Sequence, residues 1–192
     1  MILPIVAYGS PVLRAVAQPI TPDYEGLKEL IASMWETMYH SNGVGLAAPQ
    51  INRSIRLFIV DSEQIFANRE EDDELYPDAP GFKGTFINAQ IIEVDGGLWS
   101  YNEGCLSIPK VREDVLRQRS VTLRFFDEHF VEHTRTFIGL SARVILHEYD
   151  HIEGKLFIDH IKPLKRTLLK RKLEDISKGR ISVDYRMSFP NK

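Results

Sequence analysis

The order in which strands and helices are predicted along this 192-residue chain constrains its fold most strongly. Short apolar segments rich in β-branched and aromatic residues predict strands at residues 55–60, 85–94, 98–101, 121–126 and 131–137. Hairpin turns are expected at Gly96-Gly97 and at residues 127–129, between successive strands. Because the strands come before the last helices without regular alternation of strand and helix, the pattern predicts an α+β fold.

Three segments have the spacing of apolar residues that is typical of an amphipathic helix. They span residues 24–40, 140–152 and 163–177. Asp23 is a candidate N-cap of the first helix, and Ser141 is a candidate cap of the second. The third helix begins with Pro163 and ends before Gly179, residues that commonly mark the two ends of a helix.

The composition excludes several classes of protein. A net charge of -3 provides no strong field for nucleic acid or an anionic membrane, and no apolar run approaches the roughly 20 residues that cross a bilayer. The apolar start, residues 1–6, lacks the flanks of a signal peptide and is interpreted as a strand or arm. Cys105 is the single cysteine, so an internal disulfide is impossible and a reducing cytoplasm fits.

The strongest local pattern is His147-Glu148-Tyr149-Asp150-His151, which lies in the second predicted helix. Side chains four residues apart project from the same face of a helix, so His147 and His151 can bind one metal ion. Glu148 lies beside them and can move the proton of an activated water. Taken alone, the pattern also fits a polar helix surface that carries two histidines without binding a metal.

The third metal ligand is not decided by the helix pattern. One metalloprotease pattern continues to a third histidine after a glycine; here Gly154 is kept, but Phe157 occupies the histidine position. Asp159 and His160 are the downstream candidates. Upstream, Cys105 lies in a glycine-containing segment at the end of a predicted strand, and its thiolate is a good ligand for zinc or ferrous iron.

Residues 43–50, Gly-Val-Gly-Leu-Ala-Ala-Pro-Gln, form a further cluster. The two glycines let a ligand approach the backbone closely, and Gln50 offers an amide donor. Residues 46–48 are expected to start a buried helical turn. The glycine spacing does not match a phosphate loop. Taken alone, an ordinary loop between a helix and a strand is the simpler interpretation.

The three clusters together resemble the peptide deformylase family. Its pattern is G-φ-G-φ-A-A-x-Q, then E-G-C-φ-S, then H-E-x-D-H, where φ is apolar. Residues 43–50, 103–107 and 147–151 match all three in this order, and residues 8–14 look like the family's N-terminal segment. The resemblance covers most of residues 5–162. It implies an α+β fold in which antiparallel sheets pack around a central metal-bearing helix.

The resemblance also implies the roles of individual residues. Cys105, His147 and His151 become the metal ligands, and Glu148 becomes the general base and then the general acid. Gln50 and the backbone N–H of Leu106 become the oxyanion donors. The family's metal is one ferrous ion per chain in the cell, which zinc, nickel or cobalt often replaces. Residues 1–192 are then expected to form a single catalytic domain.

The implied substrate is the N-formyl group on the first methionine of a nascent polypeptide, and the product is formate. Residues implied or considered for substrate binding are Val44, Gly45, Gly104, Arg112, Leu140 and Val144. Val44 and Gly45 are expected along the substrate backbone, Arg112 at the pocket rim, and Leu140 and Val144, with Ile145, at the methionine side chain. Glu103 is expected to pair with Arg117.

Two other classes of function are compatible with parts of the sequence. A metalloprotease would need a third ligand downstream, and a structural zinc module would need four protein ligands. The basic face of the 163–177 helix also allows docking on the ribosome, although a solvated amphipathic helix explains it more simply.

Some features have no assigned role. The acidic segment 63–83 is interpreted as a solvated loop insertion, and the tail 178–192 matches no pattern. Arg143 places a charge within the metal-bearing helix, where it must pair or extend toward solvent. The sequence does not decide the metal, the oligomeric state or the preference beyond the first methionine.

Overall fold

The computed structural model describes residues 1–67, 78 and 80–190. Its α-helices are α1 (Leu27–His40), α2 (Glu63–Phe66), α3 (Gly139–Ile152) and α4 (Pro163–Ser177). Its strands are β1 (Ile5–Val6), β2 (Gly45–Ala47), β3 (Leu57–Asp61), β4 (Lys83–Cys105), β5 (Ile108–Phe126), β6 (Glu132–Ile138) and β7 (Met187–Ser188). Short 3-10 helices cover Pro11–Arg14, Ala48–Ile51 and Phe157–Asp159.

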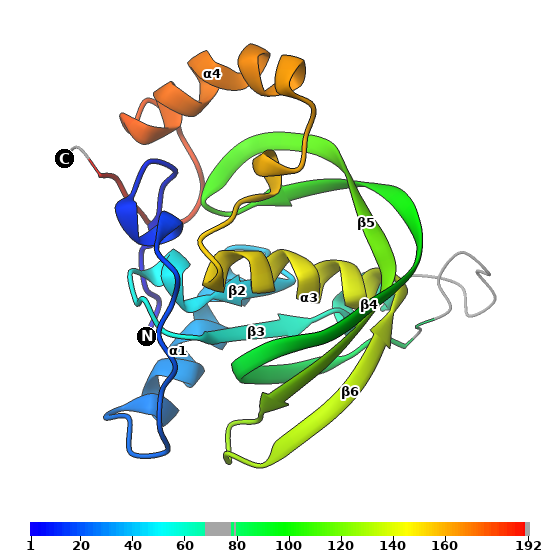
Figure 1. The fold of residues 1–192 in the computed structure, drawn as a ribbon. Helices are drawn as coiled ribbons and strands as arrows, with labels where there is room; N and C mark the ends of the chain where they lie inside the picture. Colours follow the sequence, from blue (N-terminus) through cyan, green and yellow to red (C-terminus); the bar gives the residue numbers. More distant parts are fainter. Residues whose placement is uncertain (68–77, 79, 191–192) are drawn as a thin grey trace.

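The main sheet has five strands in the order β2-β3-β4-β5-β6, and every neighbouring pair is antiparallel. The long β4–β5 hairpin bends over the molecule (Figure 1). A second, two-stranded sheet joins β1 and β7, near the two ends of the chain, in parallel. The predicted α+β fold with an antiparallel sheet is therefore confirmed.

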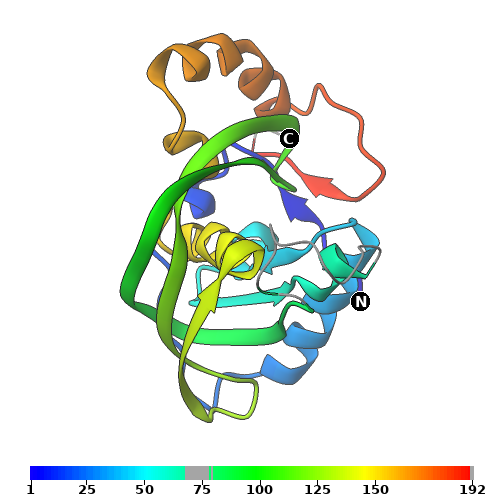
Figure 2. The same cartoon turned by 90° about the vertical axis from the view of Figure 1, so that its right-hand side faces the viewer.

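Helix α3 lies inside the curve of the sheet, where β3, β4, β5 and β6 surround it (Figures 1 and 2). Most of its side chains are buried, and these include polar and charged residues as well as apolar ones. Closely packed phenylalanines form the layer beneath it: Phe86 stacks on Phe58 at 4.7 Å and lies tilted against Phe125 at 4.4 Å, measured between ring centroids. This close packing gives α3 a rigid support.

Strand β3 is buried on both faces because helices cover both sides of this part of the sheet. Phe58 and Val60 belong to the apolar cluster that contains α3, whereas Leu57 and Ile59 belong to the cluster that contains α1. Alternate side chains of a strand point to opposite faces, so a strand between two helices must be apolar throughout. Among the described residues, no helix is long and apolar enough to cross a membrane.

Helix α4 packs against the body of the protein through only part of its apolar side. Leu173 and Ile176 are buried, whereas Leu164 and Leu168 are 73% and 76% exposed. Its predicted bounds, and those of the 140–152 helix, agree with the structure to within one residue.

The predicted hairpin turn at Gly96-Gly97 is wrong. Strand β4 continues through both glycines, and the chain reverses after Cys105 instead. The pairing register shifts between Asp95 and Leu98, and Gly96 has a positive φ of 77°. The glycines therefore form a bulge that bends a continuous strand. The expected turn at residues 127–129 is present, because β5 ends at Phe126 and β6 begins at Glu132.

Two predicted helix caps are also wrong. Helix α1 begins at Leu27, and Gly26, in the left-handed region with φ 70°, occupies its N-cap position in place of Asp23. Helix α3 begins at Gly139, so Ser141 lies inside its first turn. Of the expected helical turn at 46–48, only Ala48 is helical, because Leu46 and Ala47 belong to β2.

The predicted acidic loop at 63–83 is only partly described. It begins with the short helix α2 and meets β4 at Lys83, so its two ends are regular structure. The charged run 69–74 lies outside the described residues.

Candidate active site

Three candidate metal ligands converge between the end of β4 and α3. Cys105 is the last residue of β4, and His147 and His151 lie one turn apart on α3. Their ligand atoms all lie within 4.8 Å of one another, and Cys105 Sγ lies 3.3 Å from His151 Nε2. The i, i+4 spacing brings both imidazoles to one face of the helix, and the hairpin supplies the thiol.

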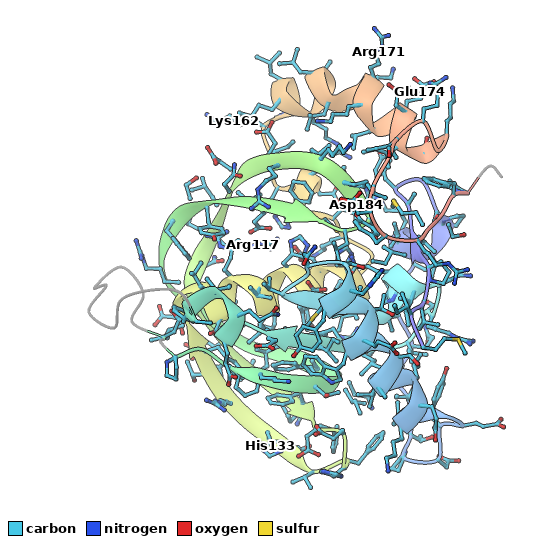
Figure 3. All side chains as sticks on the ribbon, turned by 180° about the vertical axis from the view of Figure 1, so that it is seen from behind. Arg117, His133, Lys162, Arg171, Glu174 and Asp184 are labelled. Atoms are coloured by element: carbon cyan, nitrogen blue, oxygen red, sulfur yellow. The ribbon has the colours of Figure 1, made fainter. Side chains whose placement is uncertain are left out.

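Glu103 fixes the orientation of the His147 ring. Its Oε2 lies 3.0 Å from His147 Nδ1, so in the neutral ring a hydrogen bond from Nδ1 to Glu103 would leave the lone pair of Nε2 for a ligand. Arg117 donates to both carboxylate oxygens of Glu103, at 2.7 and 3.0 Å, as expected for this pair. Arg117 also donates to Asp150 at 2.7 Å. Figure 3 labels this buried arginine, which lies between the curved hairpin and α3.

Arg143 is 2% exposed and has the partners that the sequence could not reveal. Its Nη1 donates to Glu103 Oε1 at 2.9 Å and to the carbonyl of Val115 at 3.1 Å, and its Nη2 donates to the carbonyl of Trp99 at 2.8 Å. The guanidinium also lies 4.6 Å from the Trp99 ring centroid. Arg143 therefore joins α3 to both strands of the β4–β5 hairpin.

Interactions among the three candidate ligands also shift the pKa values of Cys105 and His147. Burial alone would raise the pKa of the Cys105 thiol, but the charge of His151 and hydrogen bonds with both histidines outweigh it and lower this pKa to about 5. Burial would lower the pKa of His147, but hydrogen bonds with Cys105 and Glu103 raise it well above its usual value. Cys105 is therefore a thiolate at neutral pH, the form that binds metals.

This donor set fits a divalent metal ion. A thiolate and two imidazoles suit zinc or ferrous iron, and three protein ligands leave a position open. Among the described residues, the group that could hold a metal has these three members. The other candidates have different contacts: Asp159 pairs with Arg14, His160 lies 2.7 Å from Asp150, and the Phe157 ring stacks on His147.

Glu148 is buried directly beside the ligands. It is 4% exposed, and its Oε2 has no hydrogen-bond partner among the described residues. Burial raises the pKa of Glu148 to about 7, against the smaller opposing effect of both histidines. A side chain at Gly45 would place its Cβ 2.4 Å from Glu148 Oε1, so only glycine lets β2 pass this carboxyl.

Gln50 points its amide nitrogen at the same group. Its Oε1 accepts a hydrogen bond from the backbone N–H of Ala47 at 2.8 Å, which fixes the amide orientation. Its Nε2 lies 3.5 Å from Cys105 Sγ and 3.4 Å from Ser107 Oγ. The neighbouring Leu106 carbonyl accepts a hydrogen bond from the Tyr185 hydroxyl at 2.7 Å, so the tail holds this backbone in place.

A cavity of about 330 Å³ opens over these groups. Six of the substrate-binding candidates from the sequence line it, namely Val44, Gly45, Gly104, Arg112, Leu140 and Val144. Ile145, the further candidate for the methionine side chain, is instead fully buried in the core on the inner face of α3. At the rim, Arg112 donates to the side chain and carbonyl of Asn102.

Several residues at the site have no recognisable signal in the sequence. Ile65, Tyr101 and Asn102 line the cavity, and Tyr185 supports Leu106 from the tail. Each reaches the site through tertiary structure, and none belongs to one of the three sequence motifs. Arg143 is different, because a charge within the predicted metal-bearing helix left two alternatives, pairing or extension toward solvent, and the structure shows that it is paired.

A thiolate and two imidazoles beside a buried carboxyl, at the base of a cavity, form the kind of site found in metal-dependent hydrolases. The sequence profile described as polypeptide deformylase matches residues 2–167. The chain is 54% identical to the peptide deformylase of Flavobacterium johnsoniae, over 98% of this chain and 96% of that protein. It is also 54% identical to that of Christiangramia forsetii, over 100% and 97%.

Solved structures agree with the sequence comparisons. A peptide deformylase from Legionella pneumophila superposes with a TM-score of 0.78 at 34% identity, covering 94% of this chain and 98% of that one. The peptide deformylase from Thermotoga maritima superposes with a TM-score of 0.72 at 36% identity, covering 85% and 99%. The chain belongs to the polypeptide deformylase family.

Proposed function

We propose that this chain is a peptide deformylase, which hydrolyses the N-formyl group of the N-terminal formylmethionine of newly made polypeptides and releases formate. The observation that carries the proposal is the placement of Glu148 beside Cys105, His147 and His151 at the base of one cavity. Family membership supports the same activity. The reaction requires both a bound metal ion and a group that moves protons.

Cys105, His147 and His151 hold the metal, and ferrous iron is the ion we propose, with zinc, nickel or cobalt as substitutes. A divalent ion in this position supplies Lewis acidity, which lowers the pKa of water and polarises a carbonyl. The soft thiolate ligand favours transition metals over magnesium or calcium. Glu103 keeps His147 in the required tautomer.

Glu148 moves the proton during hydrolysis. Its carboxylate accepts a proton from the attacking water, whose oxygen forms a bond to the formyl carbon. The same carboxyl then delivers the proton to the amine nitrogen as the C–N bond breaks, giving formate and a free N-terminus. In the metal-free protein burial raises the pKa of Glu148 to about 7, and a bound divalent cation would favour the carboxylate that accepts the first proton.

Gln50 and Leu106 stabilise the charge that develops on the formyl oxygen. The Gln50 amide nitrogen and the Leu106 backbone N–H are the donors, and losing one such donor typically costs about 10²–10³ in rate. The hydrogen bond from Ala47 to Gln50 and that from Tyr185 to Leu106 fix both groups before substrate binds.

The substrate peptide lies along β2 and its side chain enters the cavity. Val44 and Gly45 pair with the peptide backbone, as an added strand would at a sheet edge. Leu140 and Val144 on α3, with Val44, form the apolar wall for the methionine side chain. Gly104 and Arg112 contact the peptide at the rim.

Formate release tests this function. The metal-loaded protein is expected to release formate from formyl-Met-Ala and to leave the unformylated peptide intact. Glu148→Ala is expected to keep its metal and lose activity, whereas Glu153→Ala, at the end of the same helix and paired with Arg56, keeps both. Cleavage of the Met-Ala bond would indicate a peptidase, and full activity of Glu148→Ala would exclude the proposed mechanism.

We also propose that residues 1–192 act as one catalytic domain in the cytoplasm and dock on the ribosome through α4. Contacts between the two ends of the chain, such as β1 with β7, support a single domain, and the lone cysteine supports a location in the cytoplasm.

The outward basic side chains of α4, including Arg171 in Figure 3, support docking on the ribosome. Lys162→Glu/Arg171→Glu is expected to reduce co-sedimentation with ribosomes at unchanged peptide activity; unchanged sedimentation would exclude this surface.

A further inference from the structure

The first turn of α3 is capped by a side chain from a distant part of the chain. Ile138, at the N-cap position, provides no side-chain cap. Instead, Asp78 accepts a hydrogen bond from the backbone N–H of Ser141 at 2.7 Å and another from that of Leu140 at 3.3 Å. The start of a helix has unpaired N–H groups and a partial positive charge, so a carboxylate there stabilises it.

The backbone at the start of α3 is shaped to admit this carboxylate. Gly139 has a positive φ of 58°, a conformation that other residues rarely adopt. A Cβ at Gly139 would lie 2.2 Å from Asp78 Oδ1 and 2.8 Å from Asp78 Cγ. The cap therefore depends on the absence of a side chain at this position.

A second contact joins the same turn of α3 to the other end of the acidic segment. The hydroxyls of Ser62 and Ser141 lie 2.8 Å apart in a buried position. Ser62 Oγ also accepts a hydrogen bond from the backbone N–H of Phe82 at 2.9 Å. Ser62, Asp78 and Phe82 thus anchor the segment at both ends, next to the start of α3.

The anchored turn forms part of the cavity wall. Leu140, whose N–H is capped, lines the cavity, and so does Val144 one turn further along α3. Ile65 of α2, which belongs to the acidic segment, lines the same cavity. The segment therefore contributes one wall residue directly and holds another in place.

We propose that Asp78 is a positioning residue for the substrate pocket: by capping α3, it fixes Leu140 in the wall of the cavity that Ile65 also lines, where the substrate side chain binds. The identification of this cavity as the substrate pocket rests on the proposed function. His147 and Glu148 lie about two turns further along α3, so loss of the cap affects substrate binding more than the chemical step.

Asp78→Ala and Asp78→Asn in the metal-loaded, full-length protein test the proposal, with Asp184→Ala as a control at an exposed aspartate. In Asp78→Ala, we expect the Leu140 and Ser141 amides to exchange with solvent about fivefold faster, the usual effect of losing a cap. We expect KM for formyl-Met-Ala to rise about fivefold, with kcat unchanged. Asp78→Asn, which keeps an acceptor oxygen, is expected to fall between Asp78→Ala and the wild type.

Unchanged amide exchange, or a loss confined to kcat, would overturn the proposal. The amide-exchange measurement does not depend on catalysis, so it tests the cap by itself. A wild-type protein inactive on formyl peptides would refute the proposed function without changing the result for the cap. A double-mutant cycle adds a further test: Gly139→Ala should raise KM less in the Asp78→Ala background, because the colliding carboxylate is gone. Additive effects of the two substitutions would contradict direct contact between them.

Discussion

Replacing Glu148 with glutamine is expected to stabilise the metal-free protein at neutral and alkaline pH. Glu148 is 4% exposed, and burial raises its pKa from 4.5 to about 7. The folded state therefore holds this proton more tightly than the unfolded state. As pH rises from about 4.5 to about 7, the unfolded chain releases the proton first, so the wild type loses stability over this window.

The two pKa values give the size of the effect. Since one pKa unit corresponds to about 1.4 kcal/mol, the wild type loses about 3 kcal/mol between pH 4.5 and pH 8 through this group. Glutamine has nearly the same shape and does not ionise, so Glu148→Gln avoids this loss. A bound divalent cation would favour the carboxylate, and metal loading should therefore shrink the difference between the two proteins.

Urea unfolding of the metal-free proteins, followed by the fluorescence of the two tryptophans, measures this difference. The unfolding free energies of wild type and Glu148→Gln should nearly agree at pH 4.5 and differ by about 3 kcal/mol at pH 8. Glu128→Gln, the same change at an exposed position, should follow the wild type throughout. Parallel stability curves for wild type and Glu148→Gln would refute the argument that burial destabilises the ionised carboxyl.

Two further substitutions test the metal site. Cys105→Ser replaces a thiolate with a hydroxyl that stays protonated, so metal content should fall or a different metal should bind, as elemental analysis after purification will show. Arg143→Met removes a donor from Glu103 and should speed metal transfer to a chelator about tenfold. Arg119→Met is its matched control, because this guanidinium also lies against the Trp99 ring, 5.4 Å from its centroid; equal transfer rates for the two variants would show that Arg143 does not support the site.

The catalytic cluster could be predicted because its chemistry is local. His147, Glu148 and His151 lie within one helical turn, and periodicity alone places both histidines on one face. Cys105 required the flanking sequence, since a lone cysteine is usually an inert core residue. Cys105 and His147 are 42 positions apart in the sequence, so only the tertiary structure brings them together. The family resemblance predicted that they share one metal site.

The first half of β5 was missed because buried charge disrupts its apolar alternation. Arg117 is 5% exposed at a position where a strand pattern requires an apolar residue, and its partners Glu103 and Asp150 lie on other elements. The spacing of apolar residues shows which positions are polar but not whether a charged side chain has a partner. A charged residue of a buried ion pair therefore looks like an exposed residue in the sequence. The same limit applies to Gly96-Gly97, because a glycine pair fits a turn and a bulge equally well.

The cap of α3 shows a different limit of sequence reasoning. Helix capping is usually read from the residues just before a helix, and this rule selected Ser141. The carboxylate comes instead from Asp78, about 60 residues earlier in the chain. A contact over that separation leaves no local pattern.

The buried ion group around Glu103 is also expected to disfavour shifted pairings of the β4–β5 hairpin. This hairpin contains several register irregularities and many exposed side chains, so shifted pairings would bury similar apolar area. A slip by one residue would turn Glu103 to the opposite face of the sheet and leave Arg117 and Arg143 buried without their shared carboxylate. Arg117 would keep Asp150, but Arg143 would be a buried charge without a carboxylate, which costs about 3–5 kcal/mol and is expected to favour the correctly paired hairpin. Glu103, which orients His147, is thus also expected to favour the correct register between β4 and β5.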